Sequence, residues 1–230
     1  MYLAIDDTDN LESRGTGRLA REIAGELSKR YGIFGVTRHQ LYVHESIPFT
    51  SHNSCAVIHV EDRHQAEMDD IFDTAKDLML SDFVEGSDPG IAIASSHQVT
   101  YGVTAFGIDA KKIVLNQDRA RKVAKNAGIR LEGLGGTEGG VIGAVAGIGL
   151  AAIKNDGRFL LKGGNRDLTG VLNVRDILCA GIDHIMTLDG RVLTDGNIDV
   201  GKSKTPSFVQ GKAVLFVDEC DGRLVALKRD

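Results

Sequence analysis

The sequence Tyr2-Leu3-Ala4-Ile5-Asp6-Asp7-Thr8-Asp9 places four apolar residues directly before three carboxylates. An unbroken apolar run of this length is typical of a short strand that is buried on both faces. The next segment, Arg14-Gly15-Thr16-Gly17-Arg18, leads into apolar residues at helical spacing, namely Leu19, Ile23, Ala24 and Leu27. The stretch therefore predicts a strand, an acidic loop, a basic loop with two glycines, and a helix, in that order.

This order suits an anion accompanied by a metal ion. The first N–H groups of a helix lack intrahelical partners and point toward any anion that lies there. Carboxylates at the end of a strand can hold Mg²⁺ and join it to phosphates, while arginines 14 and 18 supply positive charge. The alternative is a solvated turn or helix cap, because such loops are only a weak phosphate signal. Mutual repulsion of three adjacent carboxylates favours a nucleotide–metal site over the turn.

Composition limits the other classes of function. The 230 residues include 27 Lys and Arg against 32 Asp and Glu, so a net charge of −5 gives no global attraction to nucleic acid or acidic membranes. Three distant cysteines, Cys55, Cys179 and Cys220, encode neither a disulfide framework nor a zinc ribbon. The apolar run 141–153 is too short and too rich in glycine to span a bilayer. With a strand in place of a secretory signal at the start, we expect a cytoplasmic protein.

Periodicity predicts the remaining elements. We expect a helix over residues 17–30 with Gly32 as its left-handed cap, strands over 35–43, 55–60 and 91–94, and a helix over 68–79. Through residue 95 this gives β-α-β-β-α-β, the pattern of a ferredoxin-like sandwich. Further on, we expect a helix from Asn116 to Ala127 ended by Gly128, and then a glycine loop over 133–140. We expect the glycines of this loop and of 141–153 to allow close packing, with contact to a ligand phosphate as the alternative. A strand at 159–161, one short helix within 171–182 and hairpin turns at Asp189-Gly190 and Asp221-Gly222 follow.

Several segments together resemble the TiaS family of tRNA agmatinylcytidine synthetases. Ile5-Asp6-Asp7-Thr8-Asp9 with Arg14-Gly15 is similar to the family's opening, and Ser46-Ile47-Pro48-Phe49-Thr50 with Asn53 is similar to a later loop. The other similar segments, in the family's order, are Asp88-Pro89-Gly90, Gly140-Val141-Ile142-Gly143-Ala144-Val145-Ala146, Arg191-Val192-Leu193 and Ala213-Val214-Leu215-Phe216. These segments extend over most of the chain, which makes the resemblance far more specific than any single motif.

The resemblance implies an α+β protein: a kinase-like α/β sandwich over residues 1–97 that binds ATP and Mg²⁺, then a ferredoxin-like domain with C-terminal hairpins over 98–230. In the family, ATP activates a cytidine and a threonine becomes phosphorylated. Metal and catalytic roles then fall on Asp6, Asp7 and Asp9, and Thr16 is the nearest candidate for the threonine, in a shifted register. The expected nucleotide-binding residues are Thr8, Arg14, Gly15, Gly17, Arg18 and Asn53.

Two departures from the family affect RNA binding. Family members continue into an OB-fold and a zinc ribbon that hold tRNA, whereas we expect a short form here, and Ser51 and His52 stand where the family has Lys and Arg. With this acidic balance and only Lys202 and Lys204 in a basic loop, the chain alone should bind tRNA weakly and without sequence preference. The alternative is a basic face gathered by folding from Arg14, Arg18, Arg21, Arg38 and Lys162.

Three functions therefore remain open. The first is an enzyme that uses ATP to phosphorylate or adenylate an RNA nucleotide or a small molecule such as an amine, with tRNA held alone or through a partner protein. The second is a non-catalytic nucleotide- or RNA-binding module. The third is an interaction subunit whose acidic cluster is structural.

Overall fold

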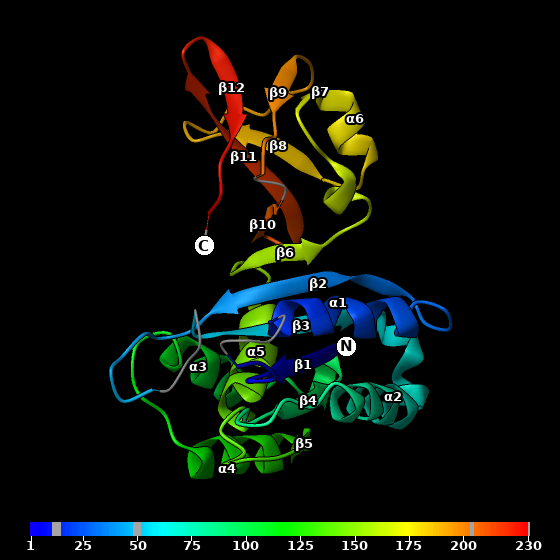
Figure 1. The fold of residues 1–230 in the computed structure, drawn as a ribbon, viewed down its shortest axis with the longest axis vertical. Helices are drawn as coiled ribbons and strands as arrows, with labels where there is room; N and C mark the ends of the chain where they lie inside the picture. Colours follow the sequence, from blue (N-terminus) through cyan, green and yellow to red (C-terminus); the bar gives the residue numbers. More distant parts are fainter. Residues whose placement is uncertain (11–14, 48–51, 203–204, 230) are drawn as a thin grey trace. The chain divides into compact units, whose positions relative to one another are not determined.

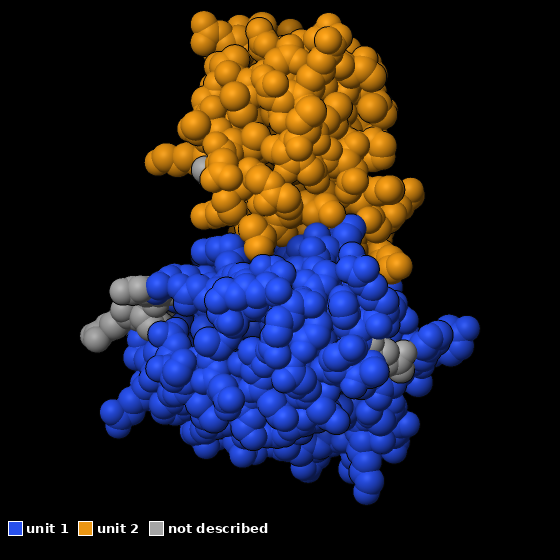
Figure 2. All heavy atoms as spheres, turned by 90° about the vertical axis from the view of Figure 1, so that its right-hand side faces the viewer, with its two compact units in different colours: residues 1–153 blue, residues 154–230 orange. Residues whose placement is uncertain are grey.

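The computed structural model describes residues 1–10, 15–47, 52–202 and 205–229. The chain forms two compact units, residues 1–153 and residues 154–230 (Figures 1 and 2). The expected boundary after residue 97 therefore does not coincide with the division between these units.

The first unit is built on an antiparallel sheet. Its strands are β1 (Tyr2–Asp6), β2 (Ile33–Gln40), β3 (Ser54–Val60), β4 (Gly90–Ala94) and β5 (Arg130–Gly133), in the order β5-β4-β1-β3-β2. Helix α1 (Thr16–Leu27) connects β1 to β2, and α2 (Met68–Ser81) follows the short 3-10 helix η1 (Asp62–Glu67) between β3 and β4. The predicted β-α-β-β-α-β order through residue 95 is confirmed.

Gly32 does not cap α1. The helix ends at Leu27, and Ser28 follows with φ −63, so no left-handed residue closes it. Gly32 instead lies against Glu61, because a Cβ on Gly32 would be 2.4 Å from the Glu61 carboxylate carbon. The prediction that Gly32 caps α1 was therefore wrong, and glycine is needed at this position because the backbone passes close to Glu61.

The two faces of the sheet differ in side-chain size. Successive residues of a strand point to opposite faces, so β1 presents Leu3 and Ile5 on one face and Tyr2 and Ala4 on the other, where Ala92 and Ala94 of β4 join them. Helices α1 and α2 cover the face with the large side chains, and α5 (Val141–Ile153) covers the face with the small ones (Figure 1). A Cβ on Gly147 would lie 2.9 Å from Cys55 Sγ. The expected close packing on α5 is confirmed.

Residues 98–153 belong to the same compact unit. After η2 (Ser96–Gln98) come α3 (Tyr101–Asp109) and α4 (Gln117–Ala127), which pack beside α5. Asn116 Oδ1 accepts a hydrogen bond from the Arg119 N–H at 2.9 Å, and Gly128 ends α4 with φ 68, as predicted. The element order after residue 97 is helix, helix, strand, helix, which differs from the expected ferredoxin-like order.

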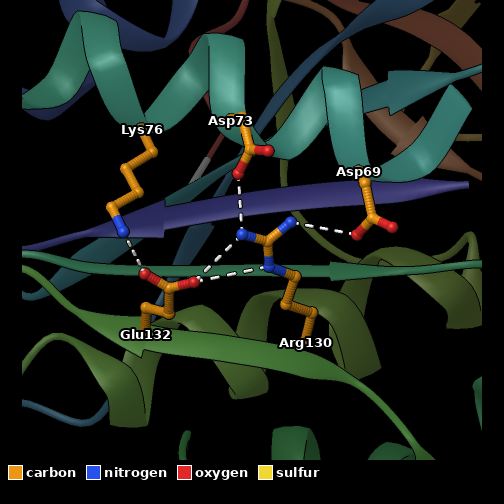
Figure 3. Close-up of polar contacts among 5 residues, drawn as sticks. All are labelled: Asp69, Asp73, Lys76, Arg130 and Glu132. Carbon is orange, nitrogen blue, oxygen red and sulfur yellow. Dashed lines mark hydrogen bonds and ion pairs between the residues drawn. The ribbon is translucent and has the colours of Figure 1, made fainter.

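An ionic network joins the edge strand β5 to α2 (Figure 3). Its members are Asp69, Asp73, Lys76, Arg130 and Glu132. The Arg130 guanidinium lies 2.7 Å from Asp73 and 3.0 Å from Asp69. It also lies 3.8 Å from the centroid of the Phe72 ring, within the range of a cation–π contact. The network fixes β5 just before the chain enters the glycine loop at 133–140.

The second unit is rich in strands and has its own apolar core. Its elements are β6 (Arg158–Leu161), η3 (Asn165–Asp167), β7 (Val171–Asn173), α6 (Val174–Cys179), β8 (His184–Thr187), β9 (Asn197–Asp199), β10 (Ser207–Val209), β11 (Lys212–Cys220) and β12 (Arg223–Ala226). The strand order is β6-β10-β11-β12-β9-β7, and β8 pairs with β11 in parallel. The hairpin turn at Asp221-Gly222 is confirmed, with φ 51 and φ 72 at its two residues.

Among the described residues, no helix is long and apolar enough to cross a membrane.

Candidate functional site

A cleft opens where β1 ends, next to the start of β4 and the first turn of α5. It holds about 820 Å³ of empty space, a figure that includes open solvent. Four acidic residues are among those that line it, namely Asp6, Asp7, Asp9 and Asp88. The lining also includes the apolar residues Leu41, Ile47, Ala110, Ile113, Leu115 and Ile142.

Asp6 lies over bare helix backbone. It ends β1, where it pairs in register with Gly90 of β4. A Cβ on Gly143 would lie 1.8 Å from Asp6 Oδ2, so only glycine at that position leaves room for the carboxylate. Burial raises the pKa of Asp6 to about 8, and the nearby carboxylates of Asp7 and Asp9 add to this, while the Asp7 backbone N–H opposes it.

Asp7 has a strained backbone. Its φ of 53 lies in the left-handed region, which a residue other than glycine seldom adopts. Burial raises the pKa of Asp7 to about 6, and repulsion by Asp88 and then by Asp9 contributes further. The Asp88 backbone N–H donates to the Asp7 carboxylate and partly offsets the rise. The Asp88 carboxylate in turn accepts a hydrogen bond from the Thr137 N–H, which connects the glycine loop to the acidic residues of the cleft.

Hydroxyl groups connect the acidic loop to the start of α1. Thr16 Oγ1 donates to Asp9 Oδ1 at 3.0 Å, and Thr8 Oγ1 donates to Thr16 Oγ1, also at 3.0 Å. Gly15 precedes the helix with φ 85, a left-handed value that suits glycine. The side chain of Thr16 is thus held at the cleft by two partners.

The predicted site residues separate into four groups. Asp6, Asp7, Asp9, Thr16 and Asn53 line the one cleft. Thr8 adjoins it through its hydrogen bond to Thr16, and Gly15 through Asp9, whose Oδ2 would lie 3.7 Å from a Cβ on Gly15. Gly17 lies in the first turn of α1, and Arg18 pairs with Glu22 at 2.6 Å, and neither is among the lining residues. Arg14 and the segment 48–51 lie outside the described residues. Asn53 Nδ2 donates to Tyr42 O at 2.7 Å, which holds its side chain beside the cleft.

The oxygen donors of the cleft can be compared with those that Mg²⁺ requires. Within the described part of the chain, no three His, Cys, Asp or Glu side chains are grouped so that they could hold a metal by themselves. Mg²⁺ commonly uses only one or two protein carboxylates and completes its shell with water and substrate phosphates. Closely spaced carboxylates with raised pKa values, beside the bare backbone of Gly139 and Gly143, fit such a shared ion.

Solved structures with the same fold exist. A structure of apo TiaS, an agmatidine synthetase that acts on an isoleucine tRNA, matches with a TM-score of 0.53 and 22% sequence identity. The complex of TiaS with this tRNA and ATP matches with a TM-score of 0.54 and 23% identity, and a tRNA fluorescent labeling enzyme with 0.53 and 23%. Each match covers 64% of this chain and 34 or 35% of the solved chain. Over 64% of its length, this chain shares the fold of part of TiaS.

At this identity the similarity shows the fold alone, and the matched part spans about a third of the length of the TiaS chains. A scan against models of protein families finds no match, and neither does a search of curated proteins. The predicted resemblance to TiaS is therefore confirmed at the level of the fold.

Two of the segments that resemble TiaS contribute residues that the sequence did not assign to the site. Asp88, from Asp88-Pro89-Gly90, faces Asp7, and Gly143, from the first turn of α5, lies beneath Asp6. Thr137 and Gly139 of the glycine loop also line the cleft. For Asp88 and Gly143, the position in segments similar to TiaS was the available signal, but close packing was the preferred explanation of the glycines.

Proposed function

We propose that this chain binds ATP with Mg²⁺ in the cleft and activates a substrate by phosphoryl or adenylyl transfer. The observation that carries the proposal is the set of carboxylates, two with raised pKa values, that meet at bare glycine backbone in one cleft. Strongly perturbed pKa values cluster at functional sites. A cation joined to phosphates is the ligand that relieves their repulsion.

The roles follow from the contacts. Asp6, Asp7 and Asp9 form the metal site, in which one or two of their carboxylates, with water and phosphate oxygens, would hold Mg²⁺. The bound ion would neutralise charge on the phosphates. Thr16 presents its hydroxyl to the cleft, and Asp9, 3.0 Å away, is placed to receive its proton if Thr16 is the phosphoryl acceptor. Asp88 holds the glycine loop through Thr137 and keeps Asp7 in place.

The remaining nucleotide contacts come from the segment around the start of α1 and from the residue that precedes β3. We assign them to Thr8, Arg14, Gly15, Gly17, Arg18 and Asn53. Arg18 must exchange Glu22 for a phosphate, which costs little because both side chains are about a third or more exposed to solvent. The ATP-binding, kinase-like part comprises residues 1–97 in this proposal, and α5 supplies the floor of its cleft.

The substrate is an RNA nucleotide or a small molecule. TiaS has been solved with its isoleucine tRNA and ATP, and with that tRNA, AMPCPP and agmatine. By this similarity, tRNA or an amine is the first substrate to test here, in a cytoplasmic reaction, with a partner protein supplying any further hold on the tRNA.

Calorimetry of ATP binding tests the metal site. Asp7→Asn removes one charge with little change of shape, and Mg²⁺-ATP affinity should fall by about tenfold or more. Asp77→Asn on the exposed side of α2 is the matched control, because it removes the same charge away from the cleft. Unchanged affinity in the Asp7 variant would remove these carboxylates from the metal site.

Turnover separates catalysis from binding. The wild-type chain should convert ATP in the presence of a substrate from pools of RNA or small molecules, seen as an ATP-dependent mass change. Metal-dependent ATP binding without any turnover would support the non-catalytic module instead. Absence of ATP binding would leave the acidic cluster with a structural role.

A further inference from the structure

Positive charge is concentrated in one stretch of this acidic chain. Residues 109–125 contain only two acidic side chains, Asp109 and Asp118. Their six cationic side chains, here called the α4 strip, are Lys111, Lys112, Arg119, Arg121, Lys122 and Lys125. The chain as a whole has a net charge of −5, so this local excess is a departure from its surroundings.

The fold leaves three of these lysines exposed. Helix α4 buries only Ala120 and Ala124, and Lys122 and Lys125 lie three residues apart on its solvent face. Lys112 is exposed in the turn between α3 and α4. Within the described residues, these three lysines form no ion pair, whereas Arg119 pairs with Asp109 and Arg121 with Glu138.

The strip begins at the mouth of the cleft. Lys111 and Lys112 lie between Ala110 and Ile113, both of which line the cleft. The start of α4 is tied to the glycine loop, because Gln117 Nε2 donates to Thr137 O at 2.7 Å. The Arg121–Glu138 ion pair repeats this connection one turn later.

Aromatic rings lie on the same rim. The Tyr42 N–H donates to Ala110 O at 2.9 Å, which places the start of the loop after β2 against the end of α3. The rings of Tyr42 and His44 stack with centroids 5.6 Å apart. Cations that follow a backbone, together with rings on which bases stack, are typical of single-strand binding surfaces.

We propose that the α4 strip binds the phosphate backbone of single-stranded RNA, with the rings at its end receiving a base. Lysines that contact phosphates release counterions from the RNA, and this release supplies an affinity for RNA that the acidic cleft alone cannot supply. That the bound strand also delivers a nucleotide to the cleft rests on the proposed function.

A salt titration with matched variants tests the surface. The probe is a short, labelled, single-stranded RNA of mixed sequence, followed by fluorescence anisotropy at several salt concentrations. For three phosphate contacts, the logarithm of the wild-type binding constant should fall against log salt with a slope of about −2. The triple variant Lys112→Gln, Lys122→Gln, Lys125→Gln should lose most of this slope and roughly tenfold or more in affinity at low salt.

The control removes the same charge elsewhere. Lys202→Gln, Lys212→Gln, Lys228→Gln changes three exposed lysines of the second unit. RNA affinity should stay within about twofold of wild type in this variant if the strip is the contact surface. Equal losses in both triple variants, or no loss in either, would overturn the assignment.

Two further measurements identify the partner and separate this inference from the proposed function. Unlabelled RNA should displace the probe, and polyglutamate should not, since displacement by both alike would indicate an acidic protein partner and overturn the proposal. Mg²⁺-ATP binding should be unchanged in the strip variant, because none of its three lysines lines the cleft. If ATP binding fails in the wild type while RNA binding still depends on the strip, the proposed function falls and the surface stands.

Discussion

Replacing Gly143 by alanine tests whether the Asp6 carboxylate lies on the first turn of α5. The new Cβ would meet Asp6 Oδ2 at 1.8 Å and Asp6 Cγ at 2.4 Å. Ordinary carbon contacts begin near ~3.5 Å, so the carboxylate or the helix must move by more than an ångström. Overpacking of this kind costs about 1–3 kcal/mol of folding free energy.

The effect should reverse when Asp6 is removed. In an Asp6→Gly background the clash disappears, and alanine then gains up to about 1 kcal/mol over glycine inside a helix. Gly143→Ala should therefore destabilise the wild type and stabilise the Asp6→Gly variant, a coupling of about 2–4 kcal/mol. Gly25→Ala in α1 is the control, because its Cβ would meet no atom within 4 Å, and it should stabilise both backgrounds.

Denaturant unfolding of the wild type, the two single variants and the double variant measures this coupling directly, with Gly25→Ala as the control in both backgrounds. If Gly143→Ala were neutral in the wild type, or equally harmful in both backgrounds, the carboxylate could not lie where the contacts place it. Mg²⁺-ATP affinity of the single variant adds a second measurement, since a displaced Asp6 should weaken it.

Two other predictions concern stability. Burial raises the pKa of Asp6 from 3.8 to about 8, so between these pH values the folded chain retains a proton that the unfolded chain releases, and stability must fall as pH rises through this window. Asp6→Asn should therefore gain stability relative to wild type at pH 8 compared with pH 5, and parallel unfolding curves at the two pH values would contradict the raised pKa. In the network of Figure 3, Arg130→Met should lose about 1 kcal/mol, whereas Asp69→Asn should stay within about 0.5 kcal/mol because the Asp69 side chain is 88% exposed. Chemical denaturation at low salt compares them, and equal losses would mean that Arg130 acts through Asp69 after all.

The order of elements in the first unit could be predicted because its signals are local. The apolar run before Asp6 and the helical spacing in α2 each lie within a few residues. Helix α3 was missed because its apolar residues are not confined to one side, with Tyr101 almost fully exposed and Phe106 buried. The predicted boundary after residue 97 does not coincide with the division between the compact units at residue 153. Helix α5 covers the second face of the sheet from far along the chain, and such a long-range contact leaves no local signal in the sequence.

In the candidate site, too, the residues that are close in sequence could be predicted, and those that only the fold brings together could not. Asp6, Asp7 and Asp9 are neighbours in sequence, so their cluster is visible without a structure. Asp88 joins them only through the register that pairs Asp6 with Gly90. The sequence could not show that Gly143, in the apolar helix α5, leaves room for the Asp6 carboxylate and not for a neighbouring helix.

The order in which the first unit emerges during synthesis follows from the position of α5. The strands β1 to β4 and helices α1 and α2 are complete by residue 94, but the helix that covers their alanine-rich face ends at residue 153. Translation at about 5–20 residues per second leaves that face uncovered for about 3–12 s while the next ~60 residues are made. During this interval the nascent chain exposes an apolar sheet surface, and Asp6 lacks the glycine backbone on which it later rests. Competence to bind a ligand in the cleft therefore arises only when α5 docks, well after the acidic loop has left the ribosome.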